Sequence, residues 1–141
     1  MIGLDTNVLL RWLIPDLESN LGSSEAEIER VSRILQAEGA RFFVNLIVIA
    51  ETAWVLERTL KLARPDVSQV VSSLLYAENI TVGNDAEVRA AQSEFEQSNA
   101  GLADCLIAQV NLAAACTHTL TFDQRASRTA GFRHVDEHGS I

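Results

Sequence analysis

Four carboxylic acids stand at positions where a hydrophobic core would not place them. Asp5 and Asp123 each follow a short β-like segment, whereas Glu51 and Asp104 lie in helical segments rich in apolar residues. Carboxylates in such surroundings need a compensating cation, because burying an unpaired charge is costly. An all-oxygen cluster without cysteine suits hard ions such as Mg²⁺ or Mn²⁺ rather than zinc. These ions activate water and stabilise the leaving oxygen in phosphodiester hydrolysis.

Each acid taken alone also has an ordinary structural interpretation. Asp5 and Asp123 would cap the helices that follow them, and Asp104 lies in a first helical turn, where the helix dipole favours an acid. Glu51 would face solvent in a gap between apolar helix faces. We nevertheless predict that the four acids converge, because each falls at the edge where the carboxyl ends of parallel strands meet.

The elements that must position these acids alternate along the chain. Short segments rich in β-branched or aromatic residues predict strands at Ile2–Asp5, Arg41–Val44, Asn79–Val82, His118–Thr121 and Phe132–Val135. Apolar residues at helical spacing predict helices around 28–35, over 46–62 with Asn45 as its cap, from Pro65 to Leu75, around 88–95, over 102–115 and over 124–130. Strands joined by helical crossovers predict an α/β fold of three layers, with a mostly parallel sheet between helices.

The composition is typical of one folded domain spanning residues 1–141. The hydrophobic content of 48%, with seven glycines and two prolines, excludes a disordered or collagen-like chain. The longest apolar run, Phe42–Ala50, contains Asn45 and is too short to cross a bilayer. Asp5 and Arg11 interrupt the apolar start of the chain, unlike a signal peptide. We therefore expect a soluble, cytoplasmic protein without membrane contact.

The cysteines and histidines form no metal-ligand spacing. Cys105 and Cys116 are too few for a disulfide framework and too far apart for a zinc knuckle, so we expect buried thiols. His118, His134 and His138 are expected to be structural or surface residues.

The whole pattern resembles the PIN domain family, and more narrowly the VapC-type ribonuclease toxins of bacterial type II toxin–antitoxin pairs. The matching stretches are Ile2–Arg11, Glu51–Leu56, Ala103–Ala108 and Leu120–Asp123, with the four acids in the same order. The resemblance extends over positions 2 to 135. It implies a five-stranded parallel sheet with helices on both faces, and metal-dependent endoribonuclease activity.

The resemblance also assigns roles and partners. It implies that Asp5, Glu51 and Asp104 form the main Mg²⁺ or Mn²⁺ site, and that Asp123 completes it or holds a second ion. Polar groups at Thr6, Asn7 and Thr121 would support the carboxylates and the attacking water. Family members usually form homodimers and are silenced by a small VapB-like antitoxin, whose C-terminal segment enters the cleft. One departure is Asn99–Leu102, where family members often carry an aromatic residue.

The charge of the chain limits how it can bind RNA. With 11 basic and 19 acidic residues the net charge is −8, which argues against binding through bulk positive charge. The segment 124–133 nevertheless holds three arginines and no acid directly after Asp123. We predict that Arg125 and Arg128 flank the cleft and contact RNA phosphates. A solvated surface is the alternative for this segment.

Two other functions remain open from the sequence. A phosphotransfer enzyme with an aspartate nucleophile would also use an Asp after the first strand, but it usually needs a second acid where Asn7 stands and a lysine near the phosphate. Lys61 is the single lysine of the chain. A non-catalytic binding module that kept the fold is the second alternative. No glycine-rich phosphate loop indicates a nucleotide cofactor.

Overall fold

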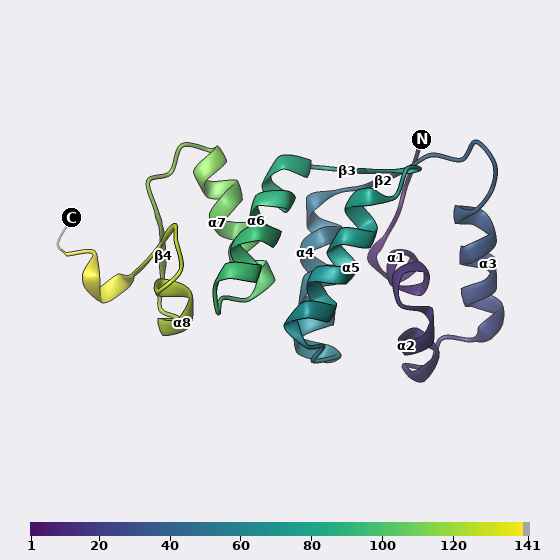
Figure 1. Cartoon of the computed structure of the whole chain (residues 1–141), viewed down its shortest axis with the longest axis horizontal. Coiled ribbons are helices and arrows are strands. Elements are labelled where there is room, and N and C mark those ends of the chain that lie inside the picture. Colours follow the sequence, from purple (N-terminus) through teal and green to yellow (C-terminus); the bar gives the residue numbers. More distant parts are fainter. Residues whose placement is uncertain (140–141) are drawn as a thin grey trace. The chain divides into compact units, whose positions relative to one another are not determined.

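The computed structural model describes residues 1–139 (Figure 1). Its strands are β1 (Ile2–Gly3), β2 (Phe42–Val44), β3 (Ile80–Val82), β4 (Thr119–Thr121) and β5 (Phe132–His134). All five predicted segments form strands, each one or two residues shorter than expected. Every strand pairing is parallel, and helices connect the paired strands, which confirms the predicted α/β class.

The strands form two sheets, so the expectation of one five-stranded sheet is wrong for this structure. One sheet has the order β1-β2-β3 and the other pairs β4 with β5. In the first sheet Ile2 is opposite Phe42 and Phe42 is opposite Ile80. The local pattern of side chains identifies a strand but not its neighbours, because pairing depends on segments far apart in the chain. With two residues in β1 and three in β4, little backbone is available to specify a further ladder.

The helices are α1 (Thr6–Leu13), α2 (Pro15–Asn20), α3 (Glu25–Leu35), α4 (Leu46–Trp54), η1 (Val55–Thr59), α5 (Arg64–Tyr76), α6 (Asp85–Gln97), α7 (Leu102–Ala113), α8 (Gln124–Ser127) and η2 (Val135–Glu137). Each predicted helical segment forms a helix, and the chain has two further ones, α2 and η2, that were not predicted. The predicted cap Asn45 is confirmed, since its Oδ1 accepts a hydrogen bond from Val48 N at 3.0 Å. The long helix expected after it is α4, continued by η1, a π-helical turn.

The described chain divides into two compact units with interleaved sequence. Unit 1 comprises Met1–Thr52 and Gln69–Gly83, and unit 2 comprises Ala53–Ser68 and the chain from Asn84 onwards. In unit 1 the sheet β1-β2-β3 has a fully buried centre at Phe42 and Val44. Helices α1, α2 and α3 pack with one another in that unit. Helices α4 and α5 each contribute residues to both units.

Unit 2 is built around the helix pair α6 and α7, which lie side by side (Figure 1). Phe95 of α6 and Cys105 of α7 are among its fully buried side chains, and Leu56 of η1 is another. Helix α8 packs against β4 and β5. Cys105 is buried as expected, and burial raises the pKa of its thiol to about 11. Cys116 is exposed, so the expectation of a buried thiol there is wrong.

Across residues 1–139, none of the helices combines the length and apolar character that crossing a bilayer requires.

Candidate functional site

Asp5 and Glu51 both hydrogen-bond to Thr6 in unit 1. Asp5 Oδ1 accepts a hydrogen bond from Thr6 N at 2.7 Å and caps α1, as the structural interpretation of the sequence anticipated. The hydroxyl of Thr6 donates to Glu51 Oε2 at 3.2 Å, from the start of α1 to the middle of α4. Thr6 is buried whereas both acids are exposed. The buried Thr6 therefore contacts both exposed carboxylates, Asp5 through its backbone N–H and Glu51 through its hydroxyl.

Asn7 does not join this pair in the structure. Its side chain lines a shallow cavity between α1 and α3 that contains neither Asp5 nor Glu51. The backbone carbonyl of Asn7 accepts a hydrogen bond from Arg11 Nη1 at 2.7 Å. A supporting role for Asn7 toward the carboxylates stays a prediction from the sequence.

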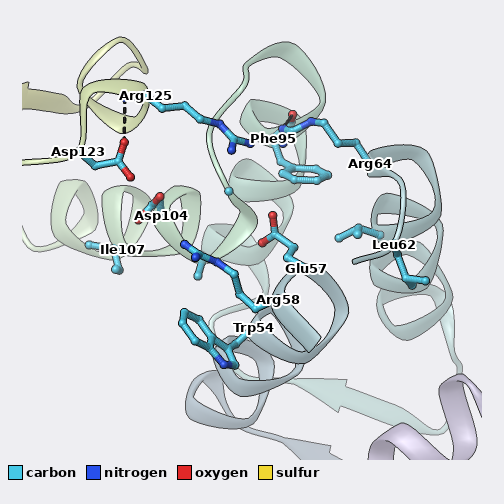
Figure 2. A pocket seen from close by; sticks show the side chains of 13 residues that line it. Trp54, Glu57, Arg58, Leu62, Arg64, Phe95, Asp104, Ile107, Asp123 and Arg125 are labelled. Atoms are coloured by element: carbon cyan, nitrogen blue, oxygen red, sulfur yellow. Dashed lines mark hydrogen bonds between the residues drawn. The ribbon is translucent and has the colours of Figure 1, made fainter. Parts of the chain in front are cut away.

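Asp104 and Asp123 form a second carboxylate pair, in unit 2. Asp104 lies in the first turn of α7, and Asp123 is the N-terminal cap of α8 (Figure 2). Asp123 Oδ1 accepts hydrogen bonds from Arg125 N at 2.8 Å and from Ala126 N at 3.1 Å. Thr121 positions Asp123 from the other side, because its Oγ1 accepts a hydrogen bond from Asp123 N at 3.0 Å. With Oδ1 used as the cap, Oδ2 of Asp123 is the oxygen left for a ligand.

The two acids of this pair have pKa values displaced in opposite directions. Burial raises the pKa of Asp104, and the negative charge of Asp123 raises it further. The backbone N–H groups of Ala126 and Arg125 lower the pKa of Asp123, which is exposed to solvent. The side chains of Arg58 and Arg125 favour the ionised form of both acids. A cation bound between the two carboxylates would relieve their repulsion.

A cavity of about 580 Å³ contains this carboxylate pair, and all of its lining residues belong to unit 2. The acids Asp104 and Asp123 share it with three arginines and with exposed apolar side chains of α4 and α7. Figure 2 shows Arg58 reaching toward Asp104 from the helical segment below, and Arg125 extending from α8 over the loop before α7. The arrangement combines oxygen ligands for a cation with guanidinium groups for an anion.

Arg125 and Arg128 occupy different surroundings although both belong to the predicted arginine segment. Arg125 lines the cavity, and its Nε donates a hydrogen bond to the backbone carbonyl of Asn99. Arg128 ends α8, is exposed, and is not among the residues that line the cavity. The structure therefore distinguishes two arginines that the sequence treated alike.

Glu57 and Arg64 are site residues that the sequence did not reveal. Glu57 Oε1 accepts a hydrogen bond from Leu102 N at 2.7 Å and so caps α7 across 45 residues of sequence. Arg64 Nη2 donates to the backbone carbonyls of Phe95, Ser98 and Ala100 at 2.6, 3.0 and 2.8 Å. These contacts hold the segment before Asp104 in place. The one sequence feature that could have indicated these two residues is that Glu57 and Arg64 lie in the same charged stretch.

Replacing Glu57 with alanine is expected to destabilise the protein by about 0.5–2 kcal/mol, the usual cost of a lost helix cap. Glu57→Gln retains an acceptor oxygen and is the matched control, with a smaller loss expected. Urea denaturation of both variants measures the difference in the free energy of unfolding. Equal stability of Glu57→Ala and wild type would show that the bond to Leu102 N does not hold the start of α7.

The histidines have structural surroundings. His134 is buried; its Nε2 donates a hydrogen bond to Phe122 O at 3.1 Å, and its Nδ1 accepts one from Asp136 N at 3.1 Å. His118 and His138 contact each other at 3.4 Å between Nε2 and Nδ1. Within residues 1–139, no three His, Cys, Asp or Glu side chains group into a metal site.

Each carboxylate pair by itself fits the chemistry of a hard divalent ion. Mg²⁺ is commonly held by one or two carboxylates, with water and substrate phosphate as its other ligands. Asp104 and Asp123 provide two such groups, and Asp5 and Glu51 provide two more. The pairs belong to different units, and a shared four-carboxylate site stays a prediction.

Comparison with known protein families matches residues 2–132 to the PIN domain. A search of curated proteins found none that matches the chain.

Proposed function

The chain belongs to the PIN domain family, a nuclease fold, and on that basis we propose that it is a Mg²⁺- or Mn²⁺-dependent endoribonuclease. The observation that carries the proposal is the Asp104–Asp123 pair in a cavity that Arg58 and Arg125 also line. Two acids attract a divalent ion, and two guanidinium groups attract the phosphate of the substrate. This cavity supports the proposal because it offers groups suited to an ion and groups suited to a phosphate.

From the order of the four acids in the sequence, we propose that Asp5, Glu51, Asp104 and Asp123 act as ligands of the ion. A bound Mg²⁺ or Mn²⁺ would supply an activated water and stabilise the leaving oxygen. The protein's own part is to hold the carboxylates in position. Thr121 and the backbone of α8 fix Asp123, whereas the hydroxyl of Thr6 fixes Glu51.

The narrower proposal is that this endoribonuclease is the toxin of a type II toxin–antitoxin pair. It is supported by the order of the four acids and by the motifs around them, which resemble those of VapC-type toxins. A VapB-like antitoxin would then cover the cleft, and the active form would be a homodimer. Copurification of the chain with the product of a neighbouring small gene, and loss of ribonuclease activity in that complex, tests the pairing.

Incubation of the purified chain with single-stranded RNA in Mg²⁺, Mn²⁺ or EDTA tests the activity. Cleavage is expected with either ion and not with EDTA. Because water rather than the ribose 2′-hydroxyl is the proposed nucleophile, the products should carry no 2′,3′-cyclic phosphate. Cyclic phosphate ends, or cleavage that continues in EDTA, would contradict the proposal. A chain that neither cleaves RNA nor binds an ion would favour the non-catalytic binding module.

The two arginines after Asp123 are expected to differ in their effect on RNA binding. Arg125→Ala should weaken RNA binding and make its salt dependence shallower, because one phosphate contact is lost. Arg128→Ala serves as the matched control and should have a smaller effect, since Arg128 lies outside the cavity lining. Binding isotherms at several salt concentrations measure both slopes. An equal effect of the two variants would refute the assignment of Arg125 to the cleft.

A further inference from the structure

Trp54 is an exposed aromatic residue at the end of α4, and two core residues stand close to it in the sequence. Ala53 and Leu56 beside it are 1% and 0% exposed, whereas Trp54 is 54% exposed. Its side chain lines the cavity that holds Asp104 and Asp123 (Figure 2). The packing of α4 therefore does not account for this indole, which is costly to leave in water.

The guanidinium of Arg58 lies over the Trp54 ring, with its Cζ 4.9 Å from the ring centroid. Arg58 follows in the π-helical turn η1, in which Leu60 N donates to Val55 O at 2.9 Å. Single π-helical turns occur frequently at functional sites, where they change which side chains share a face. Here the turn begins directly after Trp54, the last residue of α4, and it carries Arg58, so that an indole and a cation line the same cavity.

We propose that Trp54 and Arg58 form a subsite for one nucleotide of single-stranded RNA. The indole stacks on an unpaired base, and the guanidinium of Arg58 binds the adjoining phosphate. This inference rests on the proposed ribonuclease function. It adds a substrate requirement, namely a base that is free to leave the helical stack.

The chemistry of the cavity favours a nucleotide as the occupant. A nucleotide has one flat aromatic base and one phosphate, which match one exposed indole beside one guanidinium. Ile107, 49% exposed, also lines the cavity near Trp54 and extends its apolar surface. Asp104 and Asp123 in the same cavity place the metal-binding groups near this base. A strand bound on Trp54 would thus carry a phosphate close to the carboxylates.

Fluorescence separates stacking on Trp54 from attraction by charge alone. The chain contains two tryptophans, so a Trp12→Phe background isolates the emission of Trp54. The probes are a short oligouridine, an abasic strand of the same length, and an RNA duplex. Measurement in EDTA prevents metal-dependent cleavage. Oligouridine should quench the emission of Trp54, and the abasic strand and the duplex should quench it much less.

Affinity measurements with the same probes test the two residues separately. Trp54→Leu should weaken binding of oligouridine about 5- to 150-fold, the range for one lost base stack, and should leave binding of the abasic strand unchanged. Trp54→Phe should restore most of the affinity. Arg58→Ala should make the salt dependence shallower by about 0.7 in the logarithmic slope for a single strand. Tyr76→Leu, which removes an exposed aromatic outside the cavity lining, is the matched control.

The outcomes distinguish this subsite from the proposed function. If wild type binds oligouridine and cleaves RNA with Mn²⁺ but Trp54→Leu binds equally well, the subsite is wrong and the ribonuclease stands. Quenching by the abasic strand equal to that by oligouridine would overturn base stacking in the same way. If wild type neither binds the strand nor cleaves RNA, both proposals fail.

Discussion

Replacement of Asp104 with asparagine is expected to abolish RNA cleavage while the metal-free protein stays as stable as wild type or becomes more stable. The loss of activity should exceed about 100-fold, because removing even an outer-shell partner of a metal ligand typically costs about 10–100-fold. The stability expectation follows from the surroundings of Asp104. Burial and the charge of Asp123 both disfavour its ionised form, so a neutral amide removes an unfavourable interaction.

The stability effect of Asp104→Asn should depend on pH in a definite direction. The folded-state pKa of Asp104 is raised above its ordinary value of 3.8, so the folded state binds this proton more tightly than the unfolded state does. Stability therefore falls as pH rises through the raised pKa, and the cost is fully present above it. The advantage of the asparagine variant should be largest at neutral pH and disappear in acid.

Asp66→Asn provides the matched control for this experiment. Asp66 also lies in a first helical turn, that of α5, but it is exposed and does not line the cavity. Its replacement should leave cleavage unchanged. Urea denaturation in EDTA measures stability, and cleavage with Mn²⁺ measures activity. A large stability loss for Asp104→Asn, or retained cleavage, would show that Asp104 acts as an isolated helix-turn acid.

Substitutions of Asp5 should separate its role as the cap of α1 from its proposed role as a metal ligand. Asp5→Asn retains a side-chain oxygen that can accept the hydrogen bond from Thr6 N, so the cap on α1 should remain. Asp5→Ala removes that acceptor and should cost about 0.5–2 kcal/mol of stability. Both variants remove the carboxylate, and both should lose cleavage by more than about 100-fold.

The two substitutions are informative together because a capping role and a ligand role predict different cleavage activities for Asp5→Asn. If Asp5 only caps α1, the asparagine variant should cleave RNA like wild type and the alanine variant should be impaired through stability alone. If Asp5 is also a ligand, the two variants should be equally inactive and differ in stability. Thermal unfolding and cleavage rates of the three proteins decide between these cases.

The sequence predicted the elements of this chain well because their signals are local. Each strand segment and each amphipathic helix carries its own periodicity, and Asn45 carries its own capping signal. The pairing of strands into two sheets was not predictable in this way. It depends on contacts between segments far apart, and β1 and β4 are too short to specify their partners by pattern.

The candidate site shows the same division between local and long-range information. The caps formed by Asp5 and Asp123 were foreseeable, because each acid directly precedes its helix. The cap that Glu57 places on α7 spans 45 residues and leaves no local trace. Trp54 stands in an apolar helical stretch where sequence favours burial, yet its side chain is exposed at the cavity. Contacts between distant segments determine both the cap formed by Glu57 and the exposure of Trp54.

Binding of Mn²⁺ to the purified chain, measured by calorimetry at neutral pH, tests the proposed four-carboxylate site most directly. Wild type should bind the ion, and both Asp5→Asn and Asp104→Asn should lose affinity by more than about tenfold, because each removes one ligand of a shared site. Asp66→Asn should bind like wild type. Full affinity in Asp5→Asn together with its loss in Asp104→Asn would contradict the shared site and assign the ion to Asp104 and Asp123 alone.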